Sequence, residues 1–358
     1  MSTRFKRSSM RKNLRVNRDE EQIELMLRVP YTDLYKALKT AMQQLGLAEE
    51  RAELCARLFA ETTRDGVYTH GLNRFPRFAA TVRNGNVDVN AEPTKMAGVG
   101  SLERWEGHRG PGNLNAYAAM HRAMALAREH GIGGVALANT NHWMRGGTYG
   151  WLAAEAGMFA MCWSNTLANM PAWGATTPTV GNNPLVIAVP RSGGHVVLDM
   201  AMSQFSYGTL AAYSKRGALL PIDGGFDSSG NLTRDAAAIE ASQRALPAGY
   251  WKGSGLSLVL DMLAAMLSVG VATHELPRDP VRESGQSQIF LAIDPGAVAG
   301  PQELSRIAEG ILSSLREATP ADPDKPVRYP GEETLRLREE NMRLGVPVDP
   351  EIWQQISS

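Results

Sequence analysis

His70 and Arg74 stand four positions apart in the segment from Gly66 to Arg77, directly after a predicted amphipathic helix. Histidine can donate or accept a proton near neutral pH. Arginine presents a planar fork of donors that matches a carboxylate. A proton donor beside a carboxylate clamp is what the reduction of a 2-keto acid requires. The alternative is a helix C-terminus that carries a histidine and an arginine on its surface.

A second histidine, His142, lies in a polar segment from Asn139 to Gly150, after a predicted strand and before a predicted helix. In α/β proteins, ligands bind at this end of a strand. His142 is therefore a second acid/base candidate. The alternative is a capped loop with a hydrogen-bonded histidine.

Three more segments carry polar groups at strand or helix ends. Trp163 to Gly174 follows a strand, and the amide and hydroxyl groups there suit a polar ligand. Asp199 ends a strand that we expect to lead into a helix at Gln204. Lys252 lies in a glycine-rich run before another helix. Backbone N–H groups at such helix starts can hold a phosphate.

Several familiar sites are absent from the sequence. No G-x-G-x-x-G opens a helix after a strand, so a Rossmann fingerprint is missing. There is no P-loop, no H-E-x-x-H, no G-x-S-x-G and no C-x-x-C. The run from Asp223 to Asn231 resembles a calcium-binding loop in its acidic residues and glycines. It lacks the closing glutamate of an EF-hand, so we interpret it as turns and expect no metal site.

The composition excludes other classes. The 358 residues contain 37 Lys plus Arg and 37 Asp plus Glu, which leaves no positive excess to bind nucleic acid or a membrane surface. Cys55 and Cys162 form no metal or disulfide pattern, which favours a reducing, cytoplasmic location. No apolar run reaches the ~18 residues of a membrane helix. Residues 1–25 begin with a basic stretch, which we expect to be a disordered tail, or to precede a true start at Met26, rather than a transit peptide.

Periodicity predicts helices at both ends of the chain and strands in the middle, which indicates a mixed α/β, α+β-like fold rather than steady βαβ alternation. The predicted helices are Thr32–Leu45 with Thr32 as N-cap, Glu49–Thr63, Arg74–Arg83, Asn113–Glu129, Leu256–Ser268, Pro301–Ala318, Glu332–Leu344 and Pro350–Ile356. The predicted strands are Gly133–Ala138, Phe159–Trp163, Leu185–Val189, Val196–Leu198 and Gln288–Ile293, with a hairpin turn at residues 191–194.

The combination of these motifs resembles the malate/L-lactate dehydrogenase type 2 family of NAD(P)-dependent reductases. The resemblance covers the chain from Met26 to its end and rests on Val67–Arg77, Asn141–Gly147, Pro171–Gly174, Asp199–Ser203, Gly249–Gly255 and Tyr329–Glu333 in that order. It implies a non-Rossmann nucleotide-binding domain with a largely antiparallel sheet, a helical domain built from both chain termini, and a homodimer. We expect residues 26–90 and 301–358 to form the helical domain and residues 91–300 the NAD(P)-binding region.

The resemblance also implies roles for individual residues. The proton donor of the family falls on His70, its carboxylate-binding arginine on Arg74, and its second active-site histidine on His142. Tyr68, Thr69 and Asn165 are further substrate-binding candidates. Cofactor contacts fall on His195, Val196, Val197, Leu198, Asp199, Met200, Ala201, Trp251, Lys252, Gly331, Glu332 and Glu333. Ala201 stands where relatives have a serine or threonine, so it lacks the hydroxyl that could bond a phosphate or ribose. Glu332 stands where a relative has a histidine, which changes the side chain offered to the cofactor there.

The implied activity is reduction of a 2-keto sugar acid by hydride transfer from NADH, with NADPH as the other possible cofactor. Asn141–Gly147 is typical of a subgroup with that substrate class. The alternatives are a malate, lactate, sulfolactate or ureidoglycolate dehydrogenase, or a cyclic-imine reductase. Outside enzymes, the alternative is a non-catalytic protein that binds a sugar acid or a nucleotide.

Overall fold

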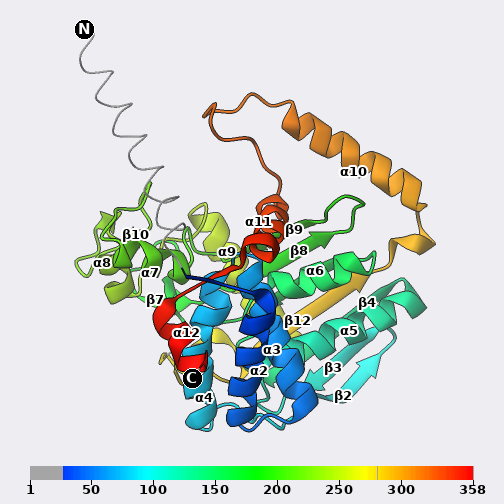
Figure 1. Cartoon of the computed structure of the whole chain (residues 1–358), viewed down its shortest axis with the longest axis horizontal. Helices are drawn as coiled ribbons and strands as arrows, with labels where there is room; N and C mark the ends of the chain where they lie inside the picture. Colours follow the sequence, from blue (N-terminus) through cyan, green and yellow to red (C-terminus); the bar gives the residue numbers. More distant parts are fainter. Residues whose placement is uncertain (1–26, 280, 358) are drawn as a thin grey trace.

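The computed structural model describes residues 27–279 and 281–357, so the expected basic tail lies outside the described residues. Its centre is a seven-stranded sheet (Figure 1). The strands in spatial order are β2 (Thr94–Val99), β3 (Leu102–Glu106), β4 (Ile132–Thr140), β12 (Gln286–Ile293), β5 (Phe159–Ser164), β8 (Leu185–Val189) and β9 (Val196–Met200). Neighbours are antiparallel except β3 and β4. The predicted mixed α/β class with a largely antiparallel sheet is confirmed.

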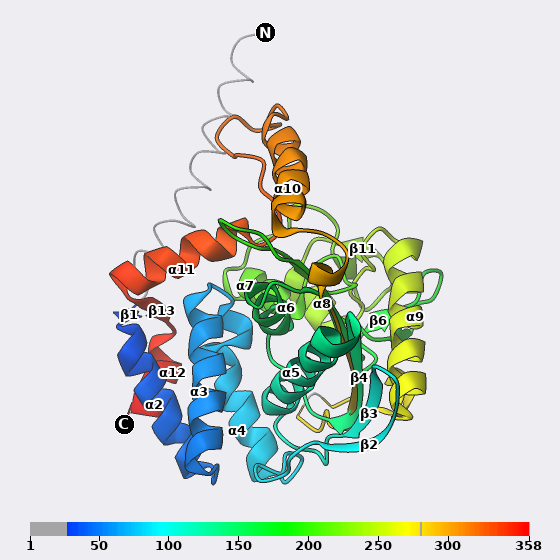
Figure 2. The ribbon, with the colours of Figure 1, turned by 90° about the vertical axis from the view of Figure 1, so that its right-hand side faces the viewer.

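Helices cover the two faces of this sheet unequally. One face packs against α5 (Gly112–His130) and α6 (Gly147–Glu155), with Tyr149 and Phe290 fully enclosed between the layers. The other face packs against α9 (Trp251–Ser268). Figure 2 shows α5 and α9 on opposite sides of β4. The central strands β4 and β12 are buried along most of their length because both faces of the sheet are covered there.

The two ends of the chain form one helical body. It contains α2 (Tyr31–Gln44), α3 (Glu49–Arg64), α4 (Phe75–Arg83) and α12 (Pro350–Ser357). Near the C-terminus, Val346, Val348 and Ile356 are buried in the same core as Leu34 and Leu38. The short strands β1 (Leu27–Val29) and β13 (Val346–Val348) pair antiparallel beside it. The predicted helical part built from both termini is confirmed, whereas the boundaries at residues 90 and 300 stay predictions.

The remaining elements are short or lie at the margins. They are β6 (Met170–Pro171), β7 (Pro178–Val180), α7 (Tyr207–Lys215), β10 (Gly225–Phe226), β11 (Leu232–Thr233), α8 (Ala236–Ser242), α10 (Pro301–Arg316) and α11 (Glu332–Leu344), with single 3-10 turns at Tyr68–His70, Leu72–Arg74, Thr273–Glu275 and Pro295–Ala297. Figure 2 shows α10 projecting from the body. Within the described residues, no helix combines the length and the apolarity that a bilayer span requires.

Some predicted helix starts are wrong. The helix predicted from Leu256 begins five residues earlier, at Trp251. The helix expected at Gln204 begins at Tyr207, because the Ser206 hydroxyl caps it by accepting a hydrogen bond from the Thr209 N–H. Thr32 is not an N-cap: α2 begins one residue earlier, after Pro30. Proline needs no N–H partner and has a fixed φ, so the residue after it enters the helix directly.

One buried carboxylate, that of Asp65, joins three segments of the chain. Asp65 ends α3 and its side chain is 3% exposed. It accepts hydrogen bonds from Arg145 (2.7 Å), which follows β4, and from Arg338 of α11 (2.9 and 2.8 Å). Its neighbour Arg64 also pairs with it at 2.9 Å. Burial opposes ionisation of Asp65, but the hydrogen bonds from Arg338 and the charge of Arg145 hold its pKa below the ordinary value.

We expect Asp65→Asn to lower the free energy of unfolding by roughly 3 kcal/mol, because the variant leaves buried guanidinium charge without its counter-ion. The folded-state pKa of Asp65 is depressed, so this stability is present above the unfolded pKa of ~3.9 and is lost as the pH falls below it. Urea unfolding at pH 7 and at pH 3.5 should therefore show a difference from wild type that shrinks in acid. Asp322→Asn, which removes an exposed i,i+3 pair, is the control and should change stability by less than about 0.5 kcal/mol. Equal stability of Asp65→Asn and wild type at pH 7 would contradict the role of Asp65.

Candidate active site

His70 and Arg74 are held by two consecutive 3-10 turns that lead into α4. Gly71 separates the turns and packs against Thr63 so closely that a Cβ there would collide with its backbone and hydroxyl. The Thr63 hydroxyl in turn accepts a hydrogen bond from the Leu72 N–H at 2.9 Å. A fully buried threonine of α3 thus fixes the backbone between the two candidate side chains.

His142 lies beside His70, as the sequence predicted for a shared site. The two rings are 5.8 Å apart between centroids, with 20° between their planes. The Nδ1 atom of His142 accepts a hydrogen bond from the Met144 N–H at 3.0 Å. Since a backbone N–H can only donate, the proton of a neutral His142 sits on Nε2. His142 therefore presents a hydrogen-bond donor at its other ring nitrogen.

The surroundings keep both histidines neutral. Burial lowers the pKa of His70 to about 4, and the charge of Arg74 adds to this shift. Burial and the charge of Arg74 also place the pKa of His142 well below its ordinary value. Burial lowers the pKa of Arg74 itself to about 10, which still leaves it ionised at pH 7. The site thus combines two neutral rings with a fixed positive charge.

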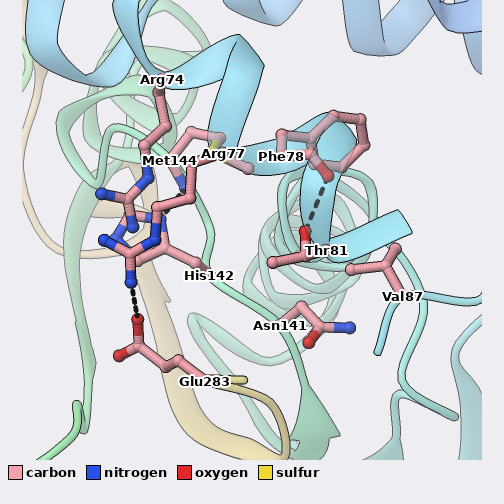
Figure 3. Close-up of a pocket in the computed structure, with 10 residues that line it drawn as sticks. Arg74, Arg77, Phe78, Thr81, Val87, Asn141, His142, Met144 and Glu283 are labelled. Carbon is pink, nitrogen blue, oxygen red and sulfur yellow. Dashed lines mark hydrogen bonds and ion pairs between the residues drawn. The ribbon is translucent and has the colours of Figure 1, made fainter. Parts of the chain in front are cut away.

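Two arginines line the pocket at His142, and they differ in their partners (Figure 3). Arg77 is paired with the buried carboxylate of Glu283 at 3.2 Å. Within the described residues, the guanidinium of Arg74 forms no ion pair and no hydrogen bond. A partly buried cation without a counter-ion attracts an anion, and the planar guanidinium suits a carboxylate.

The other substrate candidates lie in different settings. The Thr69 hydroxyl contacts Nδ1 of His70 at 3.0 Å and so belongs to the site. Tyr68 is turned towards Asn341 of α11; burial raises its pKa and the contact with Asn341 lowers it. Asn165 is fully buried and donates both amide hydrogens to protein atoms, to Asp261 at 3.0 Å and to the Val271 carbonyl at 2.8 Å. This leaves Asn165 no donor for a substrate.

Strand β9 brings the three expected cofactor segments together. The Val197 N–H donates to the Pro330 carbonyl at 2.9 Å. Gly331 has a φ of +98° and lies against His195 and Val197, which places the start of α11 on the strand. Just beyond the other end of the strand, the Ala248 N–H donates to the Met202 carbonyl at 2.8 Å, so the start of α9 lies at the opposite end of β9 from Gly331.

The side chains along this line have the chemistry that a dinucleotide needs. Trp251 is 65% exposed and offers a face for a base. Lys252 is exposed and forms no ion pair within the described residues, so it can face a phosphate. Asp199 is exposed at the end of β9, and one of its carboxylate oxygens accepts a hydrogen bond from the Gly147 N–H at 2.7 Å, so its other oxygen can accept a hydrogen bond from a ribose hydroxyl. The residues present therefore fit a nucleotide cofactor.

The remaining cofactor candidates already have protein partners. His195 lies edge-to-face on Trp151 at 5.8 Å and its Nδ1 accepts a hydrogen bond from the Arg191 N–H. Glu332 lies 3.6 Å from Arg316, and Glu333 pairs with arginines on both sides of it. A cofactor bound beside Glu332 and Glu333 would therefore contact carboxylates that are already paired with arginines.

Sequence reasoning missed three residues that hold this site. Arg145 joins it to Asp65, and its charge contributes to lowering the pKa of His70. Glu283 pairs with Arg77, whereas Arg74 has no ion-pair partner in the part of the chain that the structure describes. Gly208 of α7 touches Thr69 so closely that a Cβ would displace it. Arg145 was visible in the sequence because it lies in the motif of His142; Glu283 and Gly208 gave no signal.

Comparison with known proteins places this site in a family. A family model described as malate/L-lactate dehydrogenase matches residues 29–357. The chain is 46% identical over 332 residues to a 2,3-diketo-L-gulonate reductase of Klebsiella pneumoniae (strain 342), covering 93% of this chain and 100% of that one. A protein of the same name from Shigella boydii serotype 4 is 45% identical over 333 residues, with the same coverage.

Solved structures agree in fold. The sulfolactate dehydrogenase of Methanocaldococcus jannaschii superposes with a TM-score of 0.84 at 25% identity, covering 92% of this chain and 95% of that one. The delta1-piperideine-2-carboxylate reductase of Pseudomonas syringae pvar. tomato gives 0.83 at 26% identity, with 92% and 99% covered. The chain belongs to the malate/L-lactate dehydrogenase family and is an NAD(P)-dependent oxidoreductase.

Proposed function

We propose that the protein reduces a 2-keto sugar acid with NADH, and that the substrate is 2,3-diketo-L-gulonate, reduced at C2 to 3-keto-L-gulonate. The observation that carries this proposal is the guanidinium of Arg74, which has no ion-pair partner among the described residues, beside two neutral histidines. The identity of about 45% to reductases of that name supports the substrate.

In this proposal the chain positions the keto acid and delivers one proton. Arg74 holds the carboxylate, and Nε2–H of His142 donates a hydrogen bond to the carbonyl oxygen. When bound, the reduced nicotinamide supplies the hydride to the carbonyl carbon. The C=O π bond becomes a C–O single bond, and His70 gives its proton to the oxygen, so that the alcohol is formed. Positioning and charge stabilisation carry most of the rate.

Substrate binding prepares His70 for this role. A histidine acts as a general acid in its charged imidazolium form, whereas His70 is neutral at pH 7 in the ligand-free protein because its pKa is about 4. A bound carboxylate offsets the charge of Arg74, which is one of the causes of that low pKa. The complex therefore takes up a proton that the free site does not hold.

The cofactor proposal follows the line of β9. We assign Trp251 to a base, Lys252 to the phosphates and Asp199 to a ribose hydroxyl, with Gly331 to Glu333 at the edge. We favour NADH over NADPH. We further propose that the enzyme is a homodimer and works in the cytoplasm. The two free, buried cysteines fit the reducing cytoplasm.

A substrate panel tests the proposal against its alternatives. Loss of reduced-nicotinamide absorbance is followed with NADH and NADPH in parallel, against 2,3-diketo-L-gulonate, pyruvate, oxaloacetate, sulfopyruvate and a cyclic imine. Turnover of diketogulonate with NADH supports the proposal. Turnover of another compound alone moves the substrate within the family. A folded protein that binds NADH and turns over nothing on the panel overturns the substrate class.

His70→Ala should lower kcat for keto-acid reduction by about 10²- to 10⁴-fold, because it removes the general acid. Its unfolding midpoint should stay close to that of wild type, since the one hydrogen bond that the His70 side chain forms within the described residues is the local contact with Thr69. His130→Ala, at an exposed helix end, is the control and should leave kcat unchanged. A folded His70→Ala variant with wild-type kcat would exclude His70 as the donor.

Arg74→Ala should raise KM for the keto acid roughly 10- to 100-fold, because a charge-assisted hydrogen bond to a carboxylate contributes ~1.5–3 kcal/mol. KM for NADH should change by less than about twofold, since Arg74 lies with the substrate groups. The exposed Arg83, at the end of the helix α4 that follows Arg74, gives the matched control, Arg83→Ala. An increase in KM for NADH alone would reassign Arg74 to the cofactor.

The pH dependence should differ between kcat/KM and kcat. At saturating NADH, kcat/KM for reduction reports the enzyme without keto acid, in which the pKa of His70 is about 4. The charged donor becomes rarer above that pKa, so kcat/KM should fall about tenfold per pH unit between pH 5 and 8. The kcat value reports the complex, in which the pKa of His70 is higher, and should stay level further towards neutral pH. A kcat/KM that rises with pH over this interval would contradict the proton-donor role.

A further inference from the structure

One buried amide in the active-site pocket has an acceptor without a partner. Asn141 lies directly before His142 and lines the same pocket as Arg74. Asn141 is 4% exposed, and its Oδ1 atom has no hydrogen-bond partner among the described residues. A buried polar atom without a partner destabilises a protein, so such atoms are uncommon. The Oδ1 atom of Asn141 therefore lacks a donor that a ligand can supply.

The orientation of this amide is fixed by the backbone beside it. The Nδ2 atom of Asn141 donates to the Arg109 carbonyl at 2.7 Å and to the Gly110 carbonyl at 2.9 Å. A carbonyl can only accept, so the amide nitrogen must face these two groups and the oxygen must lie at the other edge of the amide. Arg109 has a φ of +55°, which is uncommon for a residue with a side chain. The loop thus keeps an unusual turn at the residue whose carbonyl holds Asn141.

The backbone of Asn141 is also held in place. The Nε2 atom of Gln288, on β12, donates to the Asn141 carbonyl at 3.1 Å. Gly112, at the start of α5, lies so close that a Cβ there would collide with the same carbonyl. An acceptor fixed at both its side chain and its backbone loses little conformational freedom when a ligand binds. Asn141 is therefore preorganised.

The pocket has room for one small group that donates a hydrogen bond. Its volume is about 20 Å³, enough for a water-sized group. The Thr81 hydroxyl in its wall already donates to the Phe78 carbonyl at 2.7 Å. The Glu283 carboxylate already accepts from Arg77 at 3.2 Å. A group that pairs with Asn141 must donate, which a hydroxyl does and an ionised carboxylate does not.

We propose that Oδ1 of Asn141 accepts a hydrogen bond from the first hydroxyl group of the substrate chain, and that this contact favours hydroxylated 2-keto acids over unsubstituted ones. The inference rests on the proposed function and deepens it by naming a residue that recognises the sugar part. Figure 3 shows Asn141 on the side of the pocket away from Arg74. A chain with its carboxylate on Arg74 and its carbonyl at His142 therefore continues towards Asn141. In the proposed substrate C3 is a carbonyl carbon, so the first hydroxyl group is on C4.

A bound water is the competing occupant of this place. Water can donate to Oδ1 of Asn141 and fits the same volume. A water that stays in place serves every substrate equally, whereas a contact with the substrate favours only those that carry the hydroxyl group. The two occupants therefore predict different ratios of kcat/KM.

The test compares two keto acids of equal chain length, 4-hydroxy-2-oxobutanoate and 2-oxobutanoate, with NADH and the full chain. In wild type, kcat/KM should be about tenfold higher for the hydroxylated acid, because the other acid leaves the buried acceptor unpaired. Asn141→Ala should remove this preference, and Asn90→Ala, at an exposed asparagine outside the pocket, should keep it. Equal kcat/KM values in wild type overturn the inference, and so does an Asn141→Ala variant that slows both reactions in proportion.

A binding measurement on the wild-type chain keeps the inference testable if Asn141→Ala does not fold. Calorimetry in the presence of NAD compares the corresponding alcohols, 2,4-dihydroxybutyrate and 2-hydroxybutyrate. The dihydroxy acid should bind about tenfold more tightly. Equal affinities, or no binding of either acid, overturn the inference. Neither measurement uses diketogulonate, so a chain that fails to reduce diketogulonate would refute the proposed substrate and leave the result for Asn141 unaffected.

Discussion

The buried carboxylate of Asp65 is the constraint on which the active site depends. The segment that carries His70 leaves α3 at this residue, the loop that carries His142 is tied to it through Arg145, and the helix that begins at the cofactor edge is tied to it through Arg338. These three segments come from the first fifth, the middle and the last tenth of the chain. Interactions between sequence neighbours cannot hold such distant segments in fixed positions relative to one another. One buried carboxylate that pairs with an arginine from each segment can.

The same arrangement leaves the site with surplus positive charge. Asp65 receives three arginines, and Glu283 compensates Arg77 but not Arg74. Uncompensated cations in a partly buried place are costly in the ligand-free protein. That cost is returned when an anionic substrate binds, and the loss of repulsion at the same moment favours protonation of the nearby histidine. Carboxylate recognition and proton delivery are therefore one electrostatic event in the mechanism that we propose.

The sequence predicted much of the fold because its helices and strands have clear periods. The strand Leu185–Val189 and the helix Glu332–Leu344 were predicted to the residue, and the hairpin between β8 and β9 followed from its glycines. The strands β2 and β3 were missed because β2 is exposed along its whole length and so has no apolar alternation to detect. The start of α7 was misplaced because a single serine cap, rather than the apolar pattern, decides it.

For the candidate site too, the sequence indicated residues that lie in short motifs but not their partners from distant segments. Residues adjacent in sequence to a motif, such as His70, Arg74 and His142, could be named because short segments carry them. Asn165 looked like a ligand group because it is a polar residue after a strand, but its use as a buried bridge to Asp261 depends on a helix about 100 positions away. Partners such as Glu283, which decides which arginine stays unpaired, belong to no motif. Only the folded arrangement reveals them.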